Sequence, residues 1–171
     1  MQTENLHTPR CIRTFTGQYV NVFQPDPETI NIQDIAHHLS MQCRFGGALP
    51  EHYSVAQHSF HVSEMVDPKH RLAALLHDAS EAYLVDVPSP VKKELRDYRH
   101  IEDGLMRVIA QKFGFQYPFV PEVHAADQQL LLQEWDCLML GNWQNWKHTI
   151  MFCQPGNAKR WFLKQFESLT K

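Results

Sequence analysis

Apolar residues recur with a helical period along most of the chain after position 30. Residues 31–42 place apolar side chains three and four positions apart, at Ile32, Ile35, Ala36 and Leu39. This spacing forms one apolar face of a helix, and Asn31 is suited to cap its first turn. The same period predicts further helices over residues 54–66 (with Ser54 as cap), 68–84, 97–113, 122–140 and 157–169, and one after Pro90.

Residues 12–30 follow a different pattern. β-branched and aromatic residues surround Gly17, and Pro25 and Pro27 come after them, which predicts a short extended element or hairpin and then a turn. No set of buried strands is visible elsewhere, so we expect an all-α fold. We expect one domain made of an N-terminal extended segment, a helical core and a C-terminal helical closure, over residues 1–30, 31–141 and 142–171.

The composition is that of a globular protein. The chain has 171 residues, 43% of them hydrophobic and 20% charged, which is enough for one domain with a real core. Its formal net charge of −3 gives no bulk attraction to nucleic acid polymers or anionic membranes. Uninterrupted apolar runs stay well short of the ~20 residues that a membrane span requires. We therefore expect neither a nucleic acid polymer nor a membrane among its partners.

The four cysteines lie far apart in the sequence and form no C-x-x-C pair. This argues against a zinc finger and against a compact disulfide framework, and it favours free thiols in a reducing compartment. The N-terminal residues also lack the apolar stretch of a signal peptide. Together these features predict a cytoplasmic protein.

The stretch RLAALLHDASEA, residues 71–82, ends an apolar run on an ionisable pair. If one helix continues through it, His77 lies four residues and Asp78 three residues before Glu81, so all three reach one sector of the helix surface. One alternative is a solvated, partly exposed helix end. The other is a pocket in which a bound cation removes the repulsion between the two carboxylates.

Two further residues are suited to join this group. His58 lies in the preceding predicted helix, and consecutive helices with a short connection pack as antiparallel neighbours. Asp127 comes shortly before three consecutive leucines, and a carboxylate at the edge of a core-facing stripe is costly unless it is paired or metal-bound. Imidazoles and ionised carboxylates around an open position are typical ligands of a divalent cation.

The order His58, His77-Asp78, Asp127 resembles the ligand set of the HD-domain superfamily of metal-dependent phosphohydrolases. Further segments are similar to its bacterial 5′-deoxynucleotidase branch: RF at 44–45, SVAQHS at 54–59, HDASEA at 77–82 and DVPSPVK at 86–92. The similarity covers about residues 44–140. The doublet alone is a weak signal, but the doublet with these segments is a strong one. The preceding TGQYVNVFQP and INIQDIAHHLSMQCRFGG look like a variant found in phage and prophage-borne members.

The resemblance implies the fold of an HD-domain helical bundle and a mononuclear metal site. His58, His77, Asp78 and Asp127 would hold one divalent cation, either Mn, Co, Fe, Mg or Zn, with waters completing its shell. Glu81 would orient or deprotonate a water activated by the cation.

Other matching residues would contact the substrate. Asp86, on a loop stiffened by prolines, would give a proton to the leaving 5′-oxygen or hold the sugar. Arg44 offers a bidentate fork for phosphate oxygens. Lys92 is a second phosphate contact or, as an alternative, a solvated lysine in the first turn of a helix. The deoxynucleotidases have a tryptophan after the arginine, packed against the sugar, and this chain has Phe45 there, which leaves the discrimination between ribose and deoxyribose open.

The chain has 11 histidines, and His61, His100 and His124 match no ligand of the motif. Some HD relatives use extra histidines to bind a second metal, whereas here we expect surface or capping roles for these three. The tryptophans Trp135, Trp143, Trp146 and Trp161 are expected to pack the C-terminal helices or a subunit contact.

The expected function is a 5′-nucleotidase that removes phosphate from (deoxy)nucleoside 5′-monophosphates, with a small-molecule nucleotide as its substrate. The alternatives are an HD-type nucleotide diphosphatase or phosphodiesterase, a non-catalytic nucleotide-binding or metal-binding regulator on the same fold, and a purely structural metal site. A homodimer is expected from the resemblance alone.

Overall fold

A computed structural model describes residues 10–171, and the first nine residues of the expected extended segment lie outside this range. An antiparallel hairpin opens the described chain, with β1 (Cys11–Arg13) paired to β2 (Tyr19–Asn21). Gly17 lies in the connecting turn at φ 88°, which glycine adopts without strain. The extended element predicted for residues 12–30 is therefore confirmed as a hairpin.

Helices dominate the rest of the described chain. They are α1 (Ile32–Met41), α2 (Val55–Glu64), α3 (Arg71–Leu75), α4 (Glu81–Leu84), α5 (Ser89–Lys92), α6 (Arg96–Phe113), α7 (Pro121–Glu134) and α8 (Pro155–Leu169). Short 3-10 turns occupy Pro27–Thr29, Arg44–Gly47, Pro68–His70 and Trp143–Asn145, and a π-helical turn occupies Trp135–Met139. The expectation of an all-α fold is confirmed, since residues 10–171 contain only one two-stranded sheet.

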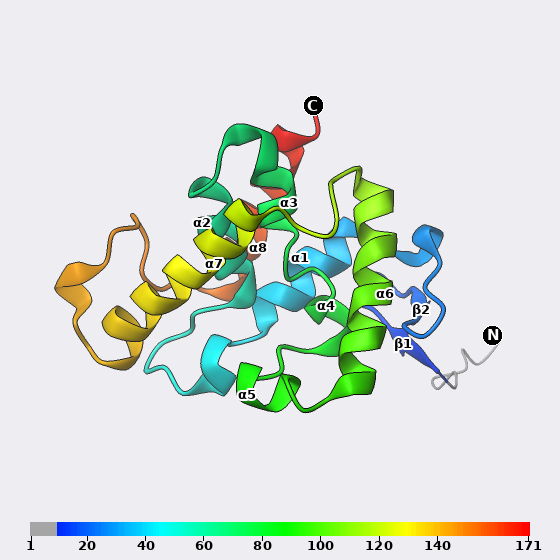
Figure 1. The fold of residues 1–171 in the computed structure, drawn as a ribbon. Coiled ribbons are helices and arrows are strands. Elements are labelled where there is room, and N and C mark those ends of the chain that lie inside the picture. Colours follow the sequence, from blue (N-terminus) through cyan, green and yellow to red (C-terminus); the bar gives the residue numbers. More distant parts are fainter. Residues whose placement is uncertain (1–9) are drawn as a thin grey trace.

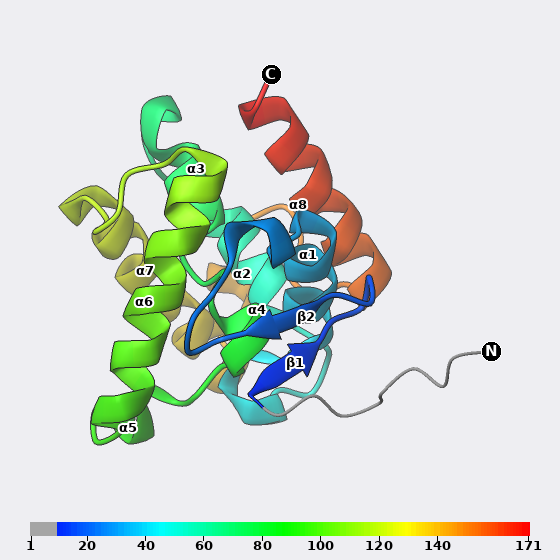
Figure 2. The same ribbon diagram turned by 90° about the vertical axis from the view of Figure 1, so that its right-hand side faces the viewer.

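Helices α1 and α2 form the centre of the fold. Helix α1 packs against α8, α4 and α2, and α2 also packs against α3, α7 and α8. Figure 2 shows α6 and α8 on opposite sides of this centre, with the hairpin across one face. The main core includes Ile35 and Leu39 of α1 and Phe162 of α8. The C-terminal helix thus completes the core that supports the first two helices.

Both helix caps expected from the sequence are present. The side chain of Asn31 accepts a hydrogen bond from the backbone N–H of Gln33 at 2.9 Å. The hydroxyl of Ser54 accepts one from the backbone N–H of Gln57 at 3.1 Å. Such caps satisfy backbone donors that have no partner inside the helix. The second cap fixes the first turn of the helix that carries His58.

The continuous helix expected over residues 68–84 is wrong. Helix α3 ends at Leu75, and α4 begins only at Glu81. In an unbroken helix the carbonyl of Ala74 would accept a hydrogen bond from the N–H of Asp78. Instead Nδ1 of His77 lies 2.8 Å from that carbonyl oxygen, and a side chain that takes a backbone acceptor competes with the helix. The sequence predicted that His77 and Glu81 share one helical face, and the break between α3 and α4 shows that they do not.

Other boundaries are close to those predicted. Helix α6 covers the range expected as 97–113, and α7 with its π-helical turn covers most of 122–140. The helix expected after Pro90 is a single turn, α5, which begins one residue earlier than Pro90, at Ser89. In Figure 1, α7 runs away from the centre of the molecule toward the segment that connects it to α8. Within residues 10–171, no helix has both the length and the apolar character needed to cross a membrane.

Candidate metal centre

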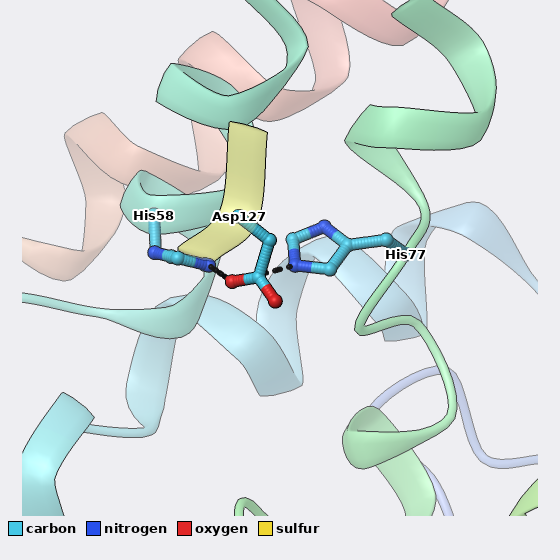
Figure 3. A group of neighbouring side chains, drawn as sticks. All are labelled: His58, His77 and Asp127. Carbon is cyan, nitrogen blue, oxygen red and sulfur yellow. Dashed lines mark hydrogen bonds and ion pairs between the residues drawn. The ribbon is translucent and has the colours of Figure 1, made fainter. Parts of the chain in front are cut away.

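Three segments of the chain bring ligand-type side chains to one point. His58 comes from α2, His77 from the turns between α3 and α4, and Asp127 from α7, with ligand atoms within 4.8 Å of one another. Figure 3 shows the carboxylate of Asp127 between the two imidazoles. Oδ2 of Asp78 lies 3.2 Å from Nε2 of His77 and 3.8 Å from Nε2 of His58. The four residues that the resemblance named as ligands therefore lie together.

The His58 ring is fully buried, and its Nδ1 contacts the carboxylate of Glu134. Nδ1 of His58 lies 2.7 Å from Oε1 of Glu134, while Nε2 lies 3.1 Å from Oδ1 of Asp127. Burial would raise the pKa of Glu134, but the charges of His58 and Arg44 outweigh it and lower that pKa to about 2. An ionised carboxylate only accepts hydrogen bonds, so Nδ1 of His58 donates. This leaves Nε2 directed at the cluster, as in known metal-bound histidines.

The His77 ring is oriented in a similar way by the backbone. Its Nδ1 donates to the carbonyl oxygen of Ala74 at 2.8 Å, which directs Nε2 to the cluster. That Nε2 is buried and makes no hydrogen bond of acceptable geometry, although Oδ2 of Asp78 lies 3.2 Å away. A buried polar atom without a partner is costly. A cation at the centre of the cluster would satisfy it.

The electrostatics of the cluster also fit a cation. Burial lowers the pKa of His77, but the nearby carboxylates of Asp78 and Asp127 raise it well above its usual value. Burial raises the pKa of Asp127, but its hydrogen bond with His58 and the charges of both histidines hold it far below its usual range. Excess negative charge at this point thus favours positive charge, supplied by protons or by a metal ion. The group His58, His77 and Asp127 could hold a metal ion, and its mixed nitrogen and oxygen donors suit a divalent transition metal.

A cavity of about 710 Å³ opens beside the cluster. Its lining includes most of the site residues expected from the sequence, namely Arg44, Phe45, Asp78, Glu81, Asp86, Lys92 and Asp127. A smaller cavity of about 330 Å³ adjoins His77 on another side and shares Asp78, Lys92 and Asp127 with the first. The cluster thus lies at the wall of a space large enough for a small-molecule ligand.

Glu81 is buried at the start of α4 and faces this cavity. Its Oε1 accepts a hydrogen bond from Nζ of Lys92 at 3.0 Å, whereas its buried Oε2 has no hydrogen-bond partner. Burial and the neighbouring charge of Asp78 raise the pKa of Glu81 well above its usual value. Lys92 is also paired with Glu102 at 2.6 Å. It is therefore not the freely solvated lysine that was the alternative for this position.

Asp86 and Arg44 complete the charged part of the cavity. The backbone N–H of Asp86 donates to the side chain of Gln42 at 2.9 Å, and burial raises the pKa of the Asp86 carboxyl. Nη2 of Arg44 donates to Oε2 of Glu134 at 2.9 Å, and the guanidinium lies 5.5 Å from the ring centroid of Phe45. Arg44 is thus held in place before any ligand arrives.

Two residues of the candidate site were not expected from the sequence. Glu134 anchors Arg44 and His58, and Trp135 lines the cavity instead of only packing the C-terminal helices. A signal for Glu134 was present, because it follows Asp127 by seven residues and two helical turns return to the same face. His61, His100 and His124 do not belong to the cluster within the described chain. The surface or capping role expected for His61 is wrong, because its side chain is buried within α2.

No family model matches the chain. It is 36% identical over 170 residues to a protein of Escherichia coli K12 named uncharacterized protein YfdR, and the match covers 94% of this chain and 96% of that protein. It is also 37% identical over 112 residues to an uncharacterized protein of Rhodobacter capsulatus, covering 60% of this chain and 57% of that protein. Since the first match runs through nearly the full length of both proteins, this chain belongs to the same protein family as YfdR.

Proposed function

We propose that this protein is a metal-dependent phosphohydrolase of the HD-domain type that removes the phosphate from (deoxy)nucleoside 5′-monophosphates. The observation that carries the proposal is the position of the His58, His77, Asp78 and Asp127 cluster at the wall of a cavity lined by acidic and basic side chains. A divalent cation held there would supply Lewis-acid chemistry and lower the pKa of a water molecule. The protein's own residues would bind the phosphate and transfer the protons.

Arg44 and Lys92 supply positive charge for the phosphate. The guanidinium has five N–H donors, and Nη2 is used to hold Glu134. The ion pair with Glu134 keeps the guanidinium plane fixed, so little side-chain entropy is lost when it binds a phosphate oxygen. The charge of Lys92 is balanced by two carboxylates, Glu81 and Glu102, whereas Arg44 is paired with one, Glu134. Arg44 is therefore the main phosphate contact in the proposed site.

Glu81 and Asp86 are the general acid–base groups of the proposed site. Oε2 of Glu81 is buried without a partner, so it is free to accept a proton from a water molecule that attacks phosphorus. Both carboxyls have a raised pKa, so each binds a proton more readily than an ordinary carboxylate does, as an acid–base group requires. Asp86 is the candidate donor to the leaving 5′-oxygen.

Phosphate release from a panel of nucleotides tests the proposal. The protein is stripped with a chelator, reloaded with Mn²⁺ or Co²⁺, and incubated with nucleoside 5′-mono-, di- and triphosphates and with phosphodiesters. We expect inorganic phosphate from the monophosphates only when metal is present. Cleavage of diphosphates or diesters alone would favour the other HD-type reactions, and no release from any substrate would contradict the proposal.

Matched aspartate variants connect activity to the cluster. Asp127→Asn is expected to lose metal content and phosphate release together, because the amide is a weaker ligand than the carboxylate. Asp97→Asn, at an exposed position in α6, is the control and should retain both. If the metal has only a structural role, chelation will unfold the protein, and circular dichroism before and after chelation distinguishes that case.

A further inference from the structure

The cavity beside the His58, His77 and Asp127 group is lined by two chemically different sets of side chains. The charged set includes Asp78, Asp127, Glu81, Arg44 and Lys92. The apolar set is Phe45, Leu131, Leu132, Trp135 and Met139. The proposed phosphate chemistry accounts for the charged set only.

Helix α7 contributes residues to both sets, with Asp127 in the charged set and Leu131 and Leu132 in the apolar one. Asp127 lies in the middle of this helix, and Trp135 begins the π-helical turn directly after its last residue, Glu134. Eight residues of helix cover about 12 Å, which leaves room for a sugar between a phosphate near Asp127 and a second group near Trp135. Because Glu134 is fixed by Arg44, Tyr53 and His58, the backbone that presents Trp135 is held rigidly.

Trp135 presents its indole to the cavity together with Phe45. The two ring centroids lie 6.1 Å apart at an interplanar angle of 61°, so one ring offers its face where the other offers an edge. Trp135 remains 48% exposed and its neighbour Leu132 63% exposed. Large apolar side chains that stay exposed beside a charged site are typical of a ligand-binding surface.

We propose that Trp135 is a specificity-determining residue whose indole stacks on the flat ring of the substrate, so that the site selects phosphomonoesters that carry a nucleobase over sugar phosphates that lack one. The inference rests on the proposed function for the reaction itself. The stacking itself does not depend on that reaction. An aromatic side chain binds any base through its π face and requires no hydrogen bonds to the base edges.

Binding without turnover tests the platform directly. Non-hydrolysable 5′-phosphonate analogues of a nucleoside monophosphate and of ribose 5-phosphate are titrated into Mn²⁺-loaded protein in a calorimeter. We expect Trp135→Ala to bind the nucleotide analogue about tenfold more weakly and the ribose analogue as well as the wild type does. Trp135→Phe should restore most of the affinity, because it keeps a flat ring.

The control is Trp143→Ala, which removes an exposed tryptophan that lines none of the cavities described above. It should leave both affinities unchanged. Equal weakening of both analogues by Trp135→Ala, or no weakening of either, would overturn the inference.

Kinetics separate this inference from the proposed function. With a nucleoside 5′-monophosphate, Trp135→Ala should raise KM with kcat nearly unchanged, and with ribose 5-phosphate it should change neither. If wild-type protein releases no phosphate from any substrate, the proposed function fails while the calorimetric result still decides whether Trp135 binds the base. If the wild-type protein is active and Trp135→Ala keeps the same preference for the nucleotide over ribose 5-phosphate, only the inference about Trp135 fails.

Discussion

Oε1 of Glu134 accepts a hydrogen bond from Nδ1 of His58 at 2.7 Å, and both side chains are fully buried. The same carboxylate accepts bonds from the Tyr53 hydroxyl at 2.8 Å and from Nη2 of Arg44 at 2.9 Å. One buried group therefore orients both the proposed metal ligand His58 and the proposed phosphate contact Arg44. The relationship is comparable to the carboxylate–histidine–metal arrangement of many metalloproteins.

Replacement of this carboxylate should weaken the metal centre. In Glu134→Gln the side chain keeps its size but loses its charge, so it polarises and orients His58 less well. We expect metal affinity to fall about 10- to 100-fold, measured by competition with a chromophoric chelator. Glu167→Gln, at an exposed position on α8, should bind metal like the wild type. An unchanged affinity in Glu134→Gln would show that Glu134 has no role in positioning His58.

Glu134 should also determine part of the acid stability of the metal-free protein. Its pKa is lowered from 4.5 to about 2 in the folded state, by charges that outweigh the effect of burial. A lowered pKa contributes stability above the unfolded value, and this contribution is lost as the pH falls from 4.5 towards 2. The contribution is on the order of 3 kcal/mol. Urea unfolding between pH 5 and pH 2.5 should therefore show a steeper loss of stability in the wild type than in Glu134→Gln.

Metal affinity should rise with pH. In the metal-free protein the pKa of His77 is well above its usual value, because the attraction of Asp78 and Asp127 outweighs burial. The raised pKa favours the protonated imidazole, which must lose this proton before it binds a metal. Calorimetric titrations in two buffers of different ionisation enthalpy should detect proton release on metal binding. A binding enthalpy that is independent of the buffer would contradict the protonated state of His77.

Removal of the Glu81 carboxylate should separate metal binding from turnover. Glu81→Gln is expected to keep its metal and to lose phosphate release by at least about 100-fold, since a positioned acid–base group contributes roughly 10²- to 10⁴-fold. Metal content by elemental analysis and kcat by phosphate release are the two measurements. Glu102→Gln removes the other carboxylate partner of Lys92 and should keep turnover within a few-fold of the wild type. Full activity in Glu81→Gln would exclude the role proposed for Glu81.

The local pattern of the sequence determined the helical class and most helix boundaries. The caps at Asn31 and Ser54 and the range of α6 follow from residues that lie near one another in the chain. Such features depend on periodicity and on capping, which are short-range properties. The ligand-type residues His58, His77, Asp78 and Asp127 were also identified from the sequence, through a resemblance that rests on short segments.

Tertiary structure decided the features that depend on distant segments. The break after Leu75 reflects the turn of His77 toward α2 and α7, and no local breaker such as proline or glycine lies between Leu75 and Glu81. Glu134 obtains its role from Arg44, 90 residues away in the sequence. Trp135 meets Phe45 only because α7 packs beside α2 and its preceding loop. Periodicity shows which residues face inward, but only the packed chain shows which partners they meet there.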